Sequence, residues 1–157
     1  MNRLELLVPP PLVMLVSGLL MWLISALLPV FSLAWLYSPA LGAIIGSIFG
    51  LLGVAISLTG ILTFKRLRTT VDPRRPAASS RLATSGVYRY SRNPMYLGVL
   101  LILIGWAFVL GNWLSALVPI VFIAYITRYQ ILPEEQWLQK KFGSDFLEYK
   151  RTVRRWI

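Results

Sequence analysis

Apolar residues gather in four long runs along the chain, and polar residues collect between and after these runs. The runs cover residues 12–30, 40–64, 95–110 and 113–131. Three of them reach the roughly 20 residues that a helix needs to cross a bilayer, and the third is shorter. This pattern predicts an all-α integral membrane protein with about four transmembrane helices, in a single membrane domain over residues 1–157.

Glycines mark how these predicted helices meet. Gly111 and Asn112 separate the last two runs and predict the tight turn of a helical hairpin. In the second run, Gly42, Gly46 and Gly50 are four residues apart and therefore share one helix face. Small residues at this spacing let two helix backbones approach closely, either within the chain or between two copies of it.

The pattern changes after the fourth run, where charged and apolar residues alternate. Pro133 suits the first position of a helix, and Glu134 and Glu135 follow where acidic residues are favourable. Gly143 predicts the end of this helix. A second helix then follows with four apolar positions at helical spacing, Phe146, Tyr149, Val153 and Trp156. We expect cytoplasmic C-terminal amphipathic helices over residues 133–156, the second lying at the membrane interface.

The distribution of charge predicts the orientation of the spans. The chain carries a net charge of +10, and 14 of its 16 basic residues lie in the linker 65–92 and in the tail after residue 131. The segment 31–39 and the Gly111-Asn112 turn have no charged residue. Basic loops remain in the cytoplasm, so we expect both termini and the linker there, in a cell membrane such as the bacterial inner membrane. The basic blocks predict contacts with membrane lipids and no nucleic-acid partner.

The chain has no cysteine and no histidine. Their absence excludes disulfides, thiol nucleophiles, zinc sites built from Cys and His, and an imidazole base, and we expect no metal. Any chemistry must therefore use carboxylates, phenols, amides and guanidinium groups.

Candidate chemistry gathers where the third and fourth runs meet the polar segments. A short turn makes the two spans antiparallel, which brings residues 93–96 close to residues 128–135. Arg92, Arg128 and Glu135 are the candidate catalytic residues. Each also has a plainer interpretation, since an arginine can bind lipid phosphate and an acidic residue can stabilise a helix start.

Two stretches of this region, "ATSGVYRYSRNPMYLG" and "PEEQWLQKKFGSDFLEYKRTV", resemble the catalytic half of the isoprenylcysteine carboxyl methyltransferase family. They resemble the phospholipid N-methyltransferases more distantly. The resemblance extends from about residue 69 to the C-terminus. It implies an integral membrane methyltransferase that uses S-adenosyl-L-methionine, bound on the cytoplasmic side, and a lipid-like or prenylated acceptor.

The resemblance also implies which residues contact the cofactor. Carried over by position, these are Ser80, Arg81, Leu82, Ala83, Tyr88, Asn93, Pro94, Met95, Tyr96 and Glu134. Asn93 stands where the family commonly has histidine, and Gln130 stands in register with the family's substrate-binding arginine, with Arg128 two residues away. The identity of the acceptor and of the methylated atom therefore stays open.

Two other function classes remain as alternatives. Sterol reductases share a related C-terminal architecture, so a membrane reductase that uses NADPH is one of them. A non-enzymatic basic membrane protein that only anchors lipid headgroups is the other. The uncharged "ATSG" segment and the paired glutamates argue against the anchor, which needs neither.

Overall fold

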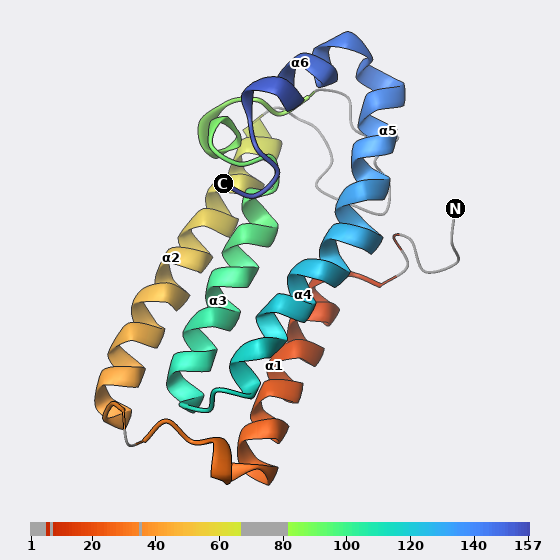
Figure 1. The fold of residues 1–157 in the computed structure, drawn as a ribbon. Helices are drawn as coiled ribbons and strands as arrows, with labels where there is room; N and C mark the ends of the chain where they lie inside the picture. The colour runs from red at the N-terminus through yellow and green to blue at the C-terminus, as the bar shows by residue number, and fades with distance from the viewer. Residues whose placement is uncertain (1–5, 7, 35, 67–81) are drawn as a thin grey trace.

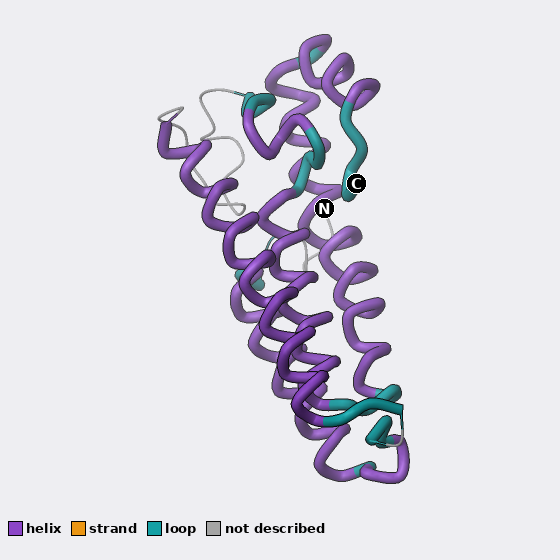
Figure 2. Tube along the Cα trace, turned by 90° about the vertical axis from the view of Figure 1, so that its left-hand side faces the viewer, coloured by secondary structure: helices purple, strands orange, loops and turns teal. Residues whose placement is uncertain are grey.

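A computed structural model describes residues 6, 8–34, 36–66 and 82–157. These residues form helices joined by short turns, and their only β contact is a single bridge between Ser32 and Asn112. The predicted all-α class is confirmed. Figure 1 shows α1, α2, α3 and α4 side by side, with α5 and α6 gathered at one end, and Figure 2 shows the same elongated bundle from another side.

The helices follow the predicted apolar runs closely. Helix α1 covers Pro10–Leu27, α2 covers Pro39–Arg66 and α3 covers Pro94–Leu110. A short 3-10 turn, η1, covers Pro29–Phe31, and another, η3, covers Gly86–Arg89. Within the described residues, the stretches Pro10–Leu27, Pro39–Arg66 and Ser115–Phe142 are long and apolar enough to cross a membrane, and Pro94–Leu110 is shorter.

The fourth run continues past its predicted end. Turn η4 (Ser115–Leu117) leads into α4 (Val118–Ile126), the π-helical turn η5 (Thr127–Ile131) and α5 (Leu132–Phe142) without a break. Helix α5 thus begins within one residue of the predicted start at Pro133, but no break separates it from the preceding helix. Proline has no N–H for the carbonyl four residues earlier, which is that of Tyr129. That carbonyl instead accepts a hydrogen bond from the backbone N–H of Leu6 (3.0 Å), so the helix continues through the proline.

Helices α2 and α3 pack along a line of glycines. A Cβ added to Gly46 would lie 2.6 Å from the carbonyl oxygen of Gly105, and one added to Gly53 would clash with the carbonyl oxygen of Gly98. A Cβ on Gly50, by contrast, would meet nothing within 4 Å. The predicted glycine packing face is thus used within the chain, and it runs through Gly53 rather than through Gly50.

Asn112 fixes the turn between α3 and α4. Gly111 adopts a left-handed conformation (φ 56°) that ends α3. The Asn112 side chain accepts hydrogen bonds from the N–H groups of Leu114 and Ser115 (3.1 Å each) and donates one to the carbonyl of Leu28 (3.0 Å). The predicted hairpin turn is present, and it also holds the end of α1.

Helix α6 (Ser144–Thr152) follows the predicted break at Gly143, which has a positive φ of 52°. Its apolar side chains Phe146 and Tyr149 are buried, together with Val153, against Leu82, Leu138 and Phe142. Trp156 packs on the main core of the bundle instead. The apolar face of α6 is thus covered by the protein itself, which differs from the expected helix at the membrane interface.

Candidate functional site

The start of α3 is a fixed corner that places Tyr96 toward α5. Asn93 precedes the helix with φ −131° and ψ 54°, and its N–H donates to the hydroxyl of Ser91 (3.1 Å). Pro94 follows as the first helical residue, where its missing N–H costs nothing and its restricted φ suits the helix. Tyr96 therefore projects from the first turn of α3 at a defined position.

Tyr96 and Glu134 join α3 to α5. The Tyr96 hydroxyl donates a hydrogen bond of 2.6 Å to Oε1 of Glu134, and only 5% of Tyr96 is exposed. Glu134 is half-buried, and Tyr96 is its hydrogen-bond partner among the described residues. A half-buried carboxyl group whose described partner is a neutral phenol is a candidate contact for a cationic ligand.

Two more phenols lie on the same side of the bundle. Tyr88, in η3, is buried, with its ring edge-on to Phe64 at 5.4 Å between centroids. The hydroxyl of Tyr149 donates to the backbone carbonyl of Tyr88 (2.7 Å). Burial raises the pKa of both phenols, and the nearby charge of Glu134 contributes to the raised pKa of Tyr88. Both therefore remain neutral hydrogen-bond donors at physiological pH.

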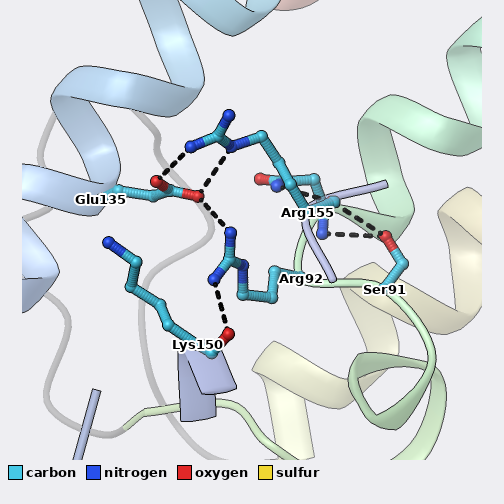
Figure 3. A network of polar contacts seen from close by, with 6 residues as sticks. Ser91, Arg92, Glu135, Lys150 and Arg155 are labelled. Atoms are coloured by element: carbon cyan, nitrogen blue, oxygen red, sulfur yellow. Dashed lines mark hydrogen bonds and ion pairs between the residues drawn. The ribbon is translucent and has the colours of Figure 1, made fainter. Parts of the chain in front are cut away.

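Glu135 is the centre of an ion-pair network with Arg92 and Arg155 (Figure 3). Nη2 of Arg92 lies 2.9 Å from Oε1 of Glu135. Arg155 binds both oxygens, with Nη2 2.8 Å from Oε2 and Nε 3.0 Å from Oε1. The hydrogen bond to Glu135 raises the pKa of Arg155, opposed by burial. The network holds two guanidinium groups on one carboxylate and has a net charge of +1.

The backbone carbonyls of residues 154 and 155 accept hydrogen bonds from the residues just before α3. The Arg92 N–H donates to the carbonyl of Arg154 (3.0 Å). The carbonyl of Arg155 accepts from the Asn93 side-chain amide (3.0 Å) and from the Ser91 hydroxyl (3.4 Å). The segment after α6 is thus bonded to the same corner that positions Tyr96.

Two buried polar atoms near the site have no hydrogen-bond partner among the described residues. They are Nε of Arg92 and Oε1 of Gln130. The other end of the Gln130 amide donates to the carbonyl of Val8 (2.7 Å), which fixes its orientation. Unpaired buried polar atoms are costly, so each is a candidate contact for a bound molecule.

The structure brings only some of the predicted site residues together. Tyr88, Asn93, Tyr96 and Glu134 surround the start of α3, as do Arg92 and Glu135. Met95 lies against Gly60 of α2 instead. Arg128 is exposed, with its guanidinium 5.6 Å from the centre of the Tyr129 ring.

The other predicted cofactor contacts are Pro94 in α3 and residues 80–83 in the linker. Pro94 and Ala83 are buried, and Leu82 packs on the α6 cluster. Ser80 and Arg81 lie outside the described residues. Among the described residues, no group of three or more Asp, Glu, His or Cys could hold a metal ion.

Sequence analysis missed the roles of Arg155, Ser91 and Tyr149. Arg155 lies beyond the end of α6, where helical periodicity no longer predicts direction. Tyr149 carried a usable signal, because a tyrosine among buried apolar positions usually finds a partner for its hydroxyl. Ser91 is a small polar residue before Asn-Pro, a position typical of turns.

Comparisons with known proteins match the part of the chain that contains the candidate site. A model of the phospholipid methyltransferase family matches residues 41–145. An uncharacterized protein of Haemophilus influenzae is 49% identical over 63 residues, which are 40% of this chain and all of that protein. No solved structure matches the chain significantly.

Two relatives carry functional names. Protein-S-isoprenylcysteine O-methyltransferase B of Arabidopsis thaliana is 32% identical over 103 residues, 66% of this chain and 52% of that protein. Protein-S-isoprenylcysteine O-methyltransferase of Saccharomyces cerevisiae is 36% identical over 72 residues, 46% of this chain and 30% of that protein. The matches thus span about half or less of these two methyltransferases.

Proposed function

Because this chain belongs to the phospholipid methyltransferase family, we propose that it is a membrane methyltransferase that transfers a methyl group from S-adenosyl-L-methionine to a lipid-like acceptor. The observation that carries this proposal is the Tyr96–Glu134 pair at the start of α3. S-adenosyl-L-methionine, when bound, supplies an electrophilic methyl group on a sulfonium cation.

The residues at the start of α3 fit such a cation. Glu134 offers a carboxyl group in a half-buried place, and Tyr88 and Tyr96 offer aromatic rings. Carboxylates and aromatic faces are the groups that attract a desolvated cation. We therefore propose Glu134, Tyr96 and Tyr88 as the main contacts to the cofactor.

The other proposed cofactor contacts have supporting roles. The Asn93 side chain is bonded to the Arg155 carbonyl, so it orients the corner and leaves its amide oxygen for a ligand. Pro94 and Met95 shape the first turn of α3. Leu82 and Ala83, with Ser80 and Arg81, complete the proposed set from the linker.

Arg92 is the proposed contact for an oxyanion. Its Nη2 is paired with Glu135, while its buried Nε has no partner within the described part of the chain and can still donate a hydrogen bond. The net charge of the network favours a carboxylate or a phosphate there. Glu135 would act by holding Arg92 in place, and the proposed role of Arg128 is to attract an anionic acceptor at the surface.

The proposed reaction needs little acid–base chemistry. Displacement at a sulfonium neutralises charge when the acceptor is an anion, so alignment and exclusion of water supply much of the rate. An amine acceptor would instead have to lose a proton, and Glu134 is the carboxylate available for this step. The two acceptor classes to compare are a prenylcysteine carboxylate, as the names of the relatives suggest, and a phospholipid amine.

The location of the site supports a cytoplasmic reaction. The start of α3, α5 and α6 lie at one end of the bundle (Figure 1), and most of the described basic residues belong to the elements that meet there. The described turns at the other end, including residues 28–34 and 111–114, have no charge. By the preference of basic segments for the cytoplasm, we propose that the site faces it and that both termini lie there.

Calorimetric titration of the detergent-purified protein tests the proposal. We expect micromolar binding of S-adenosyl-L-methionine and of its demethylated product, and no binding of NADPH. Binding of NADPH alone would replace the methyltransferase by a reductase. Binding of neither would leave a non-enzymatic role in the membrane. A screen with radiolabelled methyl donor would then compare a prenylcysteine with a phosphatidylethanolamine as acceptor.

A further inference from the structure

A basic pocket lies beside the proposed site, where the end of α2 meets η3. Its volume is about 420 Å³, and it is lined by Thr59, Leu62, Thr63, Arg66, Gly86, Val87, Arg89 and Tyr90. Figure 1 shows the segment before α3 coiled next to the end of α2. From this geometry, we propose that the pocket binds the headgroup phosphate of an anionic membrane phospholipid.

The charge of the pocket selects an anion. Arg66 comes from α2 and Arg89 from η3, so two guanidinium groups from different elements reach one pocket. No acidic residue is among the described residues that line it. The hydroxyls of Thr59 and Thr63 donate to carbonyls of their own helix (2.8 and 2.9 Å), which leaves the arginines as the main side-chain donors for a ligand. Guanidinium groups bind phosphate oxygens through paired hydrogen bonds.

A neighbouring pocket offers a contrast that supports this choice. It shares Arg89, but Asp145 and Glu148 also line it, so its charge is mixed. An anion would meet two carboxylates there and none in the pocket between α2 and η3. An anion is therefore favoured in the pocket that Arg89 lines together with Arg66, and not in the neighbouring pocket.

The surroundings of the pocket favour a lipid over a soluble phosphate. Leu62 lines the pocket, and Leu58 precedes it by one turn on the same face of α2, with 49% and 53% of these side chains exposed. Because α2 is long and apolar enough to cross a membrane, this face can carry an acyl chain while the arginines hold the phosphate. Tyr90, 79% exposed, has the interfacial position typical of aromatic residues at headgroup level.

The lipid pocket and the proposed cofactor site use different residues of η3. Val87 and Arg89 line the pocket, whereas Tyr88 between them is buried and lies near Tyr149 and Glu134. The lipid would thus be bound beside the reaction site without sharing its residues. Its binding can be measured without any assay of methyl transfer.

The test uses the full chain in nanodiscs of phosphatidylcholine with and without phosphatidylglycerol, and measures by native mass spectrometry how much of each lipid stays bound. We expect the protein to retain phosphatidylglycerol selectively. The double variant Arg66→Gln/Arg89→Gln should bind it about 30-fold more weakly, since each basic residue near a membrane contributes roughly a factor of five. The matched control Lys140→Gln/Arg151→Gln removes the same charge from exposed positions and should keep the selectivity.

Two results would overturn the proposal. An equal loss in the control variant would show that net charge, rather than this pocket, attracts the lipid. Competition by inorganic phosphate or glycerol 3-phosphate at concentrations comparable to the lipid would assign the pocket to a soluble ligand. An unchanged unfolding temperature of Arg66→Gln/Arg89→Gln in phosphatidylcholine would show that this variant is folded. Retained binding in Arg66→Lys/Arg89→Lys, which keeps the positive charges, would show that the glutamine variant lacks only the charge.

Discussion

Glu134 and Glu135 are neighbours in α5, and their side chains lie in two different electrostatic regions. Glu134 is held by one neutral phenol from α3, whereas Glu135 is bonded to two guanidinium groups, from Arg92 and Arg155. Successive residues on a helix point about 100° apart, so one turn of α5 serves both regions. The paired carboxylate of Glu135 stabilises the arrangement of the chain, and the carboxyl group of Glu134 is the one proposed to contact a ligand.

This difference implies that the two glutamates have separable functions. Removing a partner from a buried ion pair leaves an uncompensated charge and destabilises the fold. Removing Glu134, whose described partner is a neutral phenol, instead removes a ligand contact and one hydrogen bond, with a smaller loss of stability of about 1 kcal/mol. Four substitutions test this division, in order of decreasing expected effect.

The largest effect is expected for Glu135→Ala. Only 9% of the Arg92 side chain is exposed, so the loss of Glu135 leaves a buried positive charge. We expect the free energy of unfolding to fall by about 3 kcal/mol, with Arg155 contributing less because it is 34% exposed. Denaturant unfolding in detergent measures this change. The exposed Glu148 on α6 provides the control, and Glu148→Ala should change stability by less than about 0.5 kcal/mol. Equal effects of the two substitutions would contradict the structural role of Glu135.

Glu134→Ala should affect ligand binding more than stability. We expect the affinity for S-adenosyl-L-methionine to weaken by about 1–3 kcal/mol, because a charge-assisted contact is lost. Calorimetric titration measures this difference. Glu134→Gln keeps an acceptor for Tyr96 and removes only the charge, so the two variants together separate charge from hydrogen bonding. Unchanged affinity in both would remove Glu134 from the site.

Tyr96→Phe tests the same hydrogen bond by removing its donor in place of its acceptor. The substitution keeps the ring and removes the donor to Glu134, so we expect a loss of about 1 kcal/mol in cofactor affinity. Tyr90→Phe is the matched control, because this tyrosine is exposed. A similar loss in both variants would indicate a general effect of the hydroxyl groups on the protein surface.

The sequence was sufficient to predict the helices and the family. Long apolar runs leave few alternatives to spanning helices, and α1, α2 and α3 begin and end within a few residues of the predicted runs. The family predicted from the two-part motif is confirmed by the match over residues 41–145. Both predictions depend on local patterns, which the sequence displays directly.

The features that sequence analysis missed depend on distant contacts. The helix continues through Pro133 because the N–H of Leu6 satisfies the carbonyl of Tyr129, and no local pattern contains that bond. The different environments of Glu134 and Glu135 depend on Tyr96 in α3 and on Arg155 beyond α6. From position alone the two acids were equivalent, since both suit the first turn of a helix.

The smallest effect is expected for Asn93→His, which changes a residue of the α3 corner that is bonded to the C-terminal segment. The Asn93 amide donates to the carbonyl of Arg155, and an imidazole N–H can donate to the same oxygen. We expect stability and cofactor affinity to change by less than about 0.5 kcal/mol, whereas Asn93→Ala should lose about 1 kcal/mol of stability with the hydrogen bond. Unfolding and titration of both variants measure this difference. A misfolded Asn93→His protein would show that the turn before Pro94 requires asparagine itself, and equal stability of the two variants would show that the bond to Arg155 contributes nothing.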